Sequence, residues 1–134
     1  MRGIKHVVDP GFRERQFGHW EGRSWQEIQK RYPSEFARWE RYEPVVIPGG
    51  ETPDELEARA IKAWHQLLSH SFTCAAVVSH GAFNLVLLSH LMSEWQDGQR
   101  PRQQHGCVNE IQITNGVPRV VRMNLMVSTE EKVK

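Results

Sequence analysis

The sequence predicts an α/β fold in which helices cover a mixed β-sheet. Three observations predict it. Residues 53–68 have an apolar face at helical spacing, residues 74–79 are short, apolar and partly β-branched, and residues 108–125 alternate as in a hairpin. A mixed sheet covered by helices buries all three segments. At 134 residues the chain is the size of one domain, and we treat 1–134 as a single domain.

Two short helices are expected in the first third of the chain, after an irregular start at residues 1–11. Ser24 and Glu27 fit a capping box at a helix N-terminus. Pro33 then interrupts the helical pattern of residues 24–42, which therefore predicts two helical pieces.

A loop rich in proline and glycine occupies residues 43–55 and leads into a longer helix. Thr52 is placed as the N-cap and Pro53 as the first helical residue, with acidic residues in the first turn. The helix should end between Ser69 and Thr73. Its apolar face consists of Leu56, Ala60, Ala63, Trp64, Leu67 and Leu68.

The second half of the chain predicts a buried strand, a helix and a hairpin. The strand covers residues 74–79, with Cys74 packing as a small hydrophobe, and a helix follows over 82–95. Asn115-Gly116 lies between two alternating segments, residues 108–114 and 119–125, and is typical of a hairpin connection. We expect the charged tail at 126–134 to be frayed.

Composition excludes several classes of function. The net charge of +1 gives no basic field for nucleic acid, and no apolar run approaches the roughly 20 residues of a membrane span. The N-terminus lacks the apolar core of a signal peptide, so we expect a cytoplasmic protein with its two cysteines reduced. His65 and His70 are five residues apart, which does not suit a shared metal on one helix face, and neither a metal nor a cofactor is implied.

The junction Ser79-His80-Gly81 has the pattern of a site. Ligands of open α/β sheets bind beyond the carboxyl ends of strands, and the following helix would offer free backbone N–H groups to an anion. Gly81 would let a ligand approach the backbone, and His80 would face it. A structural histidine at a strand end is an equally good interpretation of these residues alone.

Residues 9–22 are too irregular for a simple amphipathic helix. They combine arginines, acids, two glycines and Trp20. An active-site wall is one interpretation, and a loop with solvated charges is the other.

Four segments together resemble the histidine phosphatase superfamily, which includes cofactor-dependent phosphoglycerate mutase and α-ribazole phosphatase. "FRERQFGHWEG" is similar to its L-x-E-x-x-[FY]-G-x-W-E-G segment, and "PGGETPDELEAR" to its P-G-G-E-[ST] loop and helix. "AAVVSHGAF" resembles the strand with the second active-site histidine, and "VNEIQI…VVRMN" the closing hairpin. The segments occur in the family's order from about Asp9 to Asn124.

The resemblance implies a role for seven residues. Glu14 would exchange a proton with the leaving oxygen and with water, and His80 would bind the transferring phosphoryl group, so both are candidate catalytic residues. Phosphate binding is implied for His80, Gly81 and Ala82, and a structural role near the site for Trp20, Glu21 and Arg59, the last through an ion pair.

The resemblance also implies what the sequence lacks. Family members begin with a strand ending in Arg-His-Gly, whose histidine is the nucleophile, and this tripeptide does not occur here. The other His-Gly pair, at His105, precedes the hairpin instead of following a buried strand. We therefore expect a phosphoglycerate mutase-like three-layer sandwich, truncated at its N-terminus, with an incomplete sheet.

Two functions follow from this expectation. The first is phosphoryl transfer or hydrolysis on a small phosphomonoester through a phosphohistidine, closer to the phosphatase branch than to the mutase branch, with activity of this chain alone in doubt. The alternative is a non-catalytic remnant that binds an anion, such as inorganic phosphate, or a protein. An unpaired strand edge would favour a homodimer or a swapped oligomer.

Overall fold

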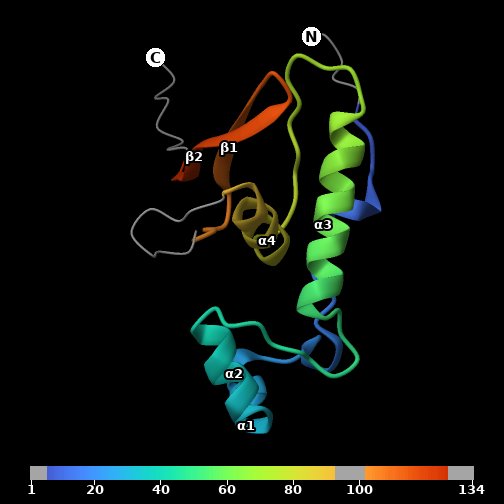
Figure 1. The fold of residues 1–134 in the computed structure, drawn as a ribbon. Helices are drawn as coiled ribbons and strands as arrows, with labels where there is room; N and C mark the ends of the chain where they lie inside the picture. Colours follow the sequence, from blue (N-terminus) through green and yellow to red (C-terminus); the bar gives the residue numbers. More distant parts are fainter. Residues whose placement is uncertain (1–5, 93–101, 127–134) are drawn as a thin grey trace, which may run out of the picture.

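The computed structural model describes residues 6–92 and 102–126. Figure 1 shows two helices at one end of the molecule, and a longer helix, a shorter helix and a hairpin at the other. In chain order, the elements are the 3-10 turns η1 (Pro10–Phe12) and η2 (Gly18–Trp20), helices α1 (Trp25–Arg31), α2 (Pro33–Glu40), α3 (Pro53–Leu68) and α4 (Gly81–Leu91), and strands β1 (Cys107–Thr114) and β2 (Val117–Met126).

The predicted helix starts are confirmed. The Ser24 hydroxyl accepts a hydrogen bond from the backbone N–H of Glu27, whose carboxylate accepts one from the backbone N–H of Ser24. Thr52 and Glu55 form the same reciprocal box at α3. Pro33 is the first residue of α2, where its missing N–H leaves no helical hydrogen bond unmade.

The hairpin is also confirmed. Strands β1 and β2 pair antiparallel, with Thr114 opposite Val117. Asn115 and Gly116 both have positive φ, at 52° and 77°, as the two-residue turn requires.

The predicted buried strand at residues 74–79 is wrong. This segment is extended, but it pairs with no strand among the described residues, and Cys74 is exposed. Val78 is 94% exposed. A β-strand forms by backbone hydrogen bonds to a neighbouring strand, and none of the described residues supplies such bonds to this segment. The helix after it begins at Gly81, and its last predicted residues, 93–95, lie outside the described residues, as does the predicted frayed tail beyond Met126.

Two separate hydrophobic clusters form the core. The first joins η1, α3 and α4, with Phe12, Leu56, Trp64 and Phe83 among its buried members, and the hairpin packs on it through Ile111. The second joins η2, α1, α2 and the following loop through Trp20, Ile28, Phe36, Val45 and Ile47. We call these the α3–α4 core and the α1–α2 core. No helix among the described residues has the length and apolar character to cross a membrane.

Candidate active site

Glu14 follows η1 and is half-buried at the start of α4. Its carboxylate accepts hydrogen bonds from the backbone N–H groups of Ala82 and Phe83, at 3.3 and 3.2 Å. It also accepts one from the N–H of Arg15, at 2.9 Å. The first turn of a helix leaves such N–H groups without helical partners, and the helix dipole favours a negative charge there. Glu14 thus caps α4 from a segment almost 70 residues earlier in the chain.

His80 is the N-cap residue of α4 in extended conformation, and its side chain makes no capping hydrogen bond. The residue is exposed, and so is Gly81, where an added Cβ would meet nothing within 4 Å. Phe83 fixes the helix start because its ring is fully buried and packs on Phe12, with ring centroids 5.4 Å apart. The buried Phe83 ring therefore fixes the start of α4, while His80 and Gly81 remain exposed beside it.

The structure brings together four of the predicted site residues. Glu14 touches the N–H of Ala82, and His80 and Gly81 directly precede that residue. The expected setting of His80 is corrected, however. It follows an exposed extended segment, not a buried strand, because residues 74–79 have no strand partner among the described residues. Two hollows of the described surface, one beside α2 and one beside α3, are lined by neither His80 nor Glu14.

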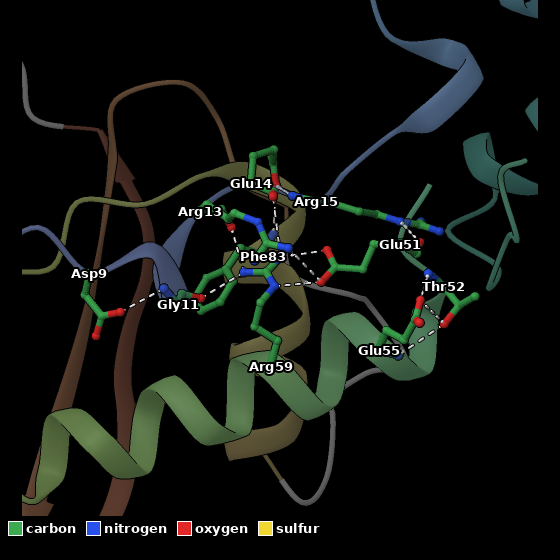
Figure 2. Close-up of polar contacts among 10 residues, drawn as sticks. All are labelled: Asp9, Gly11, Arg13, Glu14, Arg15, Glu51, Thr52, Glu55, Arg59 and Phe83. Carbon is green, nitrogen blue, oxygen red and sulfur yellow. Dashed lines mark hydrogen bonds and ion pairs between the residues drawn. The ribbon is translucent and has the colours of Figure 1, made fainter. Parts of the chain in front are cut away.

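Arg59 on α3 fixes the backbone that carries Glu14. Its guanidinium donates hydrogen bonds to the carbonyl oxygens of Gly11 and Arg13, at 2.8 and 3.0 Å. It also forms a two-pronged ion pair with the Glu51 carboxylate, at 2.6 and 2.7 Å, and lies over the Phe83 ring. Figure 2 shows Arg59 reaching from α3 to all of these groups. The ion pair expected for Arg59 is thus present, and the same guanidinium holds the loop that contains Gly11 and Arg13.

Sequence reasoning missed Glu51 and Arg15 as partners in this network. Glu51 is 7% exposed, and the Arg59 guanidinium lowers the pKa of its carboxyl group by hydrogen bonding to the ionised form. Arg15 is also buried, and its guanidinium donates to the carbonyl oxygens of Glu51 and Val45. Burial lowers the pKa of Arg15, while the charges of Glu51 and Glu14 oppose this shift. The sequence offered one signal for this pairing. Arg15 and Glu51 are charged residues that each stand near glycines and apolar residues, one in each of two separate motifs.

Glycines let the two motif loops touch backbone to backbone. Gly18 has φ of +50°, and an added Cβ there would lie 2.3 Å from the Gly50 nitrogen. Next to this contact, the N–H of His19 donates to the Pro48 carbonyl, and the N–H of Glu51 donates to the Gln16 carbonyl. The F-G-x-W and P-G-G-E segments therefore contact each other directly. This contact places the Glu51 carboxylate within hydrogen-bond distance of Arg59.

Trp20 belongs to the α1–α2 core, and Glu21 is exposed next to it in the chain. The Trp20 ring is 2% exposed, and it is edge-on to Trp39, with centroids 6.0 Å apart. The Glu21 carboxylate accepts a hydrogen bond from the backbone N–H of Phe17. Within the described residues, no group of three or more His, Cys, Asp or Glu side chains is placed to hold a metal ion.

Two comparisons with known proteins found a match for this chain. A family model described as histidine phosphatase superfamily (branch 1) matches residues 1–126. No curated protein sequence matches the chain. The crystal structure of a proposed alpha-ribazole-5'-P phosphatase from Escherichia coli K-12 matches with a TM-score of 0.72 and 20% identity. The match covers 92% of this chain and 63% of that one.

That structural likeness shows a phosphoglycerate mutase-like α/β fold, to which the four helices and the hairpin belong. The family model covers far more than half of the sequence and includes Glu14, the P-G-G-E loop and His80. The chain belongs to the histidine phosphatase superfamily, branch 1.

Proposed function

We propose that this chain binds a small phosphomonoester at the start of α4 and takes part in histidine-phosphatase-type phosphoryl transfer. The observation that supports it is the Glu14 carboxylate held against the N–H groups of Ala82 and Phe83. The proposal places an anion-accepting helix end and a proton-carrying side chain at one point. Family membership supplies the reaction class.

In this proposal the phosphoryl oxygens compete with Glu14 for the same amides. An ionised carboxylate is a hydrogen-bond acceptor only, so Glu14 cannot donate a proton while it caps the helix in its charged form. A phosphate oxygen that takes over the amides of Ala82 and Phe83 releases the carboxylate, which takes up a proton from solvent and then gives that proton to the leaving oxygen. His80 then contacts the phosphoryl group from the N-cap position, and Gly81 leaves room for the group to approach the backbone.

The nucleophile that attacks phosphorus is not assigned to any residue of this chain. The proposed roles are therefore phosphoryl binding by His80 and the following amides, and proton transfer by Glu14. The E. coli structure suggests α-ribazole 5'-phosphate as a substrate to test among small phosphomonoesters.

A second candidate is phosphate binding without turnover. The observations in its favour are that the His80 side chain makes no capping hydrogen bond and that the space at Gly81 is open, so an anion can approach the helix start without any reacting group beside it. In this case the site holds inorganic phosphate and performs no chemistry.

Two measurements on the 134-residue chain separate these functions. The first is hydrolysis of an aryl phosphate and of α-ribazole 5'-phosphate, and the second is protection against heat by phosphate or vanadate. Turnover that His80→Ala abolishes supports the enzyme. Protection without turnover supports the binding module, and neither turnover nor protection would contradict both.

The competition with Glu14 gives a sharper test. Glu14→Ala should bind phosphate more tightly than the unchanged chain, because it frees two amides and removes a negative charge. Any turnover should fall in the same variant. Glu21→Ala removes a carboxylate from the neighbouring motif without touching α4, and is the matched control. Weaker phosphate binding by Glu14→Ala would show that the carboxylate does not compete.

A further inference from the structure

Two contacts tie the residues around the start of α4 to the segment that carries Glu14. In the first, the Ser79 hydroxyl donates a hydrogen bond to the backbone carbonyl of Phe12, at 2.7 Å, although the two residues are 67 positions apart. In the second, the N–H groups of Ala82 and Phe83 donate to the Glu14 carboxylate, at 3.3 and 3.2 Å. We call these contacts the Ser79 tie and the Glu14 tie.

His80 and Gly81 are the only residues between the Ser79 tie and the Glu14 tie. The His80 backbone is extended, with φ of −129° and ψ of 164°, and its side chain makes no capping hydrogen bond. An added Cβ at Gly81 would meet nothing within 4 Å. Because the imidazole does not cap the helix, the ties on either side set where the His80 backbone lies.

The early segment, to which both ties run, is itself fixed from the side of α3. The Arg59 guanidinium donates to the carbonyl oxygens of Gly11 and Arg13, at 2.8 and 3.0 Å. Figure 2 shows both of these bonds. The carbonyl of Phe12, between these two residues, accepts from Ser79 instead. The Ser79 hydroxyl therefore binds a point of the chain that Arg59 already holds.

We propose that Ser79 is a positioning residue for His80. Through the Phe12 carbonyl, its hydroxyl holds the His80 backbone where one phosphoryl group reaches both the imidazole and the amides that Glu14 caps. This inference rests on the proposed binding of the phosphoryl group by His80. Ser79 contacts no reacting atom in this role and acts only through His80.

The role requires a hydrogen-bond donor on the β-carbon of residue 79. Threonine keeps the hydroxyl, whereas valine has nearly the shape of threonine but neither donates nor accepts. Both side chains suit extended backbone, since β-branched residues favour it. Ser79→Thr and Ser79→Val therefore differ in the hydroxyl and in little else.

Backbone dynamics of the full chain without ligand test the Ser79 tie. NMR order parameters are about 0.85 in rigid backbone and below about 0.6 in flexible backbone. We expect the amides of His80 and Gly81 to lie in the rigid range in the unchanged chain and in Ser79→Thr, and in the flexible range in Ser79→Val. If Ser79→Val does not fold, Ser79→Ala takes its place. Order parameters that do not differ between the threonine variant and the variant without a hydroxyl would overturn the proposal.

Phosphate binding tests whether Ser79 acts through His80. We expect the dissociation constant for inorganic phosphate to rise about fivefold in Ser79→Ala, the effect of one hydrogen bond. Changes to residues that act through one another are not additive, so Ser79→Ala should add no further loss to His80→Ala. The control Ser89→Ala removes another hydroxyl-to-carbonyl bond, to Leu85 within α4, and should leave the constant unchanged. Losses that multiply in the double variant would indicate a general structural role and overturn the proposal.

The two measurements separate this inference from the proposed function. If the unchanged chain binds no phosphate while loss of the hydroxyl loosens His80, the proposed function fails and the Ser79 tie stands. If the chain binds phosphate while His80 stays rigid without the hydroxyl, the proposed function stands and the role of Ser79 is refuted.

Discussion

Because Arg59 and Glu51 form an ion pair, substitutions of these two residues should have non-additive effects on the free energy of unfolding. The perturbations are Arg59→Met, Glu51→Gln and both together. Arg59→Met removes two bonds to the Glu51 carboxylate and two good bonds to the carbonyls of Gly11 and Arg13. Glu51→Gln keeps the shape of the side chain but removes its charge.

The structure sets the magnitudes. Removing one partner of a buried ion pair costs about 3–5 kcal/mol, because the other charge stays buried without compensation. Since the Glu51 side chain is 6% exposed and Arg59 14%, we expect Arg59→Met to cost about 4 kcal/mol. Glu51→Gln should cost about 2 kcal/mol, since an amide still accepts from Arg59. The double variant should cost about 4 kcal/mol, which leaves a coupling energy of about 2 kcal/mol.

Urea unfolding followed by tryptophan fluorescence measures each free energy, since the chain has five tryptophans. The control is Glu110→Gln, which breaks the exposed pair with Arg122 on the hairpin, with side chains 53% and 65% exposed. Exposed pairs of this kind contribute about 0–1 kcal/mol.

Two results would refute the reasoning. One is additivity of the two changes within about 0.5 kcal/mol. The other is a loss for Glu51→Gln no larger than that for Glu110→Gln. If Arg59→Met does not fold, Arg59→Lys keeps the charge without the fork and completes the cycle at a smaller cost.

Three further predictions concern the same framework. The folded-state pKa of Glu51 lies below its ordinary 4.5, so its stabilisation is complete above that pH and is lost as pH falls through the folded value. Between pH 6 and 3, the melting temperature of Glu51→Gln should therefore fall less than that of the unchanged chain, and equal falls would contradict the shift. Gly18→Ala should cost more than 2 kcal/mol, because a Cβ would strike Gly50, whereas Gly22→Ala meets open space and should cost about 1 kcal/mol for its positive φ. Trp20→Ala should cost about 3 kcal/mol in urea unfolding, and an unchanged midpoint would mean that the ring is not core.

Local signals in the sequence predicted local structure well. The capping boxes at Ser24 and Thr52, the helix start at Pro33 and the turn at Asn115-Gly116 depend on atoms a few residues apart, and all are present. The hydrogen bonds and backbone angles of these features involve only neighbouring residues, so the sequence predicts them without knowledge of a distant partner.

Features that depend on distant partners were not predictable in the same way. Residues 74–79 have the composition of a buried strand, but burial and pairing require a neighbour, and none of the described residues supplies one. In the sequence, Arg15 and Glu51 look like ordinary surface charges. In the structure, the contact between Gly18 and Gly50 brings their loops together and the two residues meet. The motif resemblance singled out Glu14 and His80 as candidates, but it did not reveal that Glu14 caps α4.

The position of Glu14 depends on three parts of the molecule at once. Its backbone carbonyl and its neighbours' carbonyls face Arg59 on α3, while its carboxylate holds the amides of α4. The next residue, Arg15, is bound to Glu51 and Val45, and Val45 belongs to the α1–α2 core. A change in either core can therefore move the Glu14 carboxylate without touching it. The W-E-G and P-G-G-E segments, which hold no reacting group in our proposal, thus help to position the Glu14 carboxylate through these contacts.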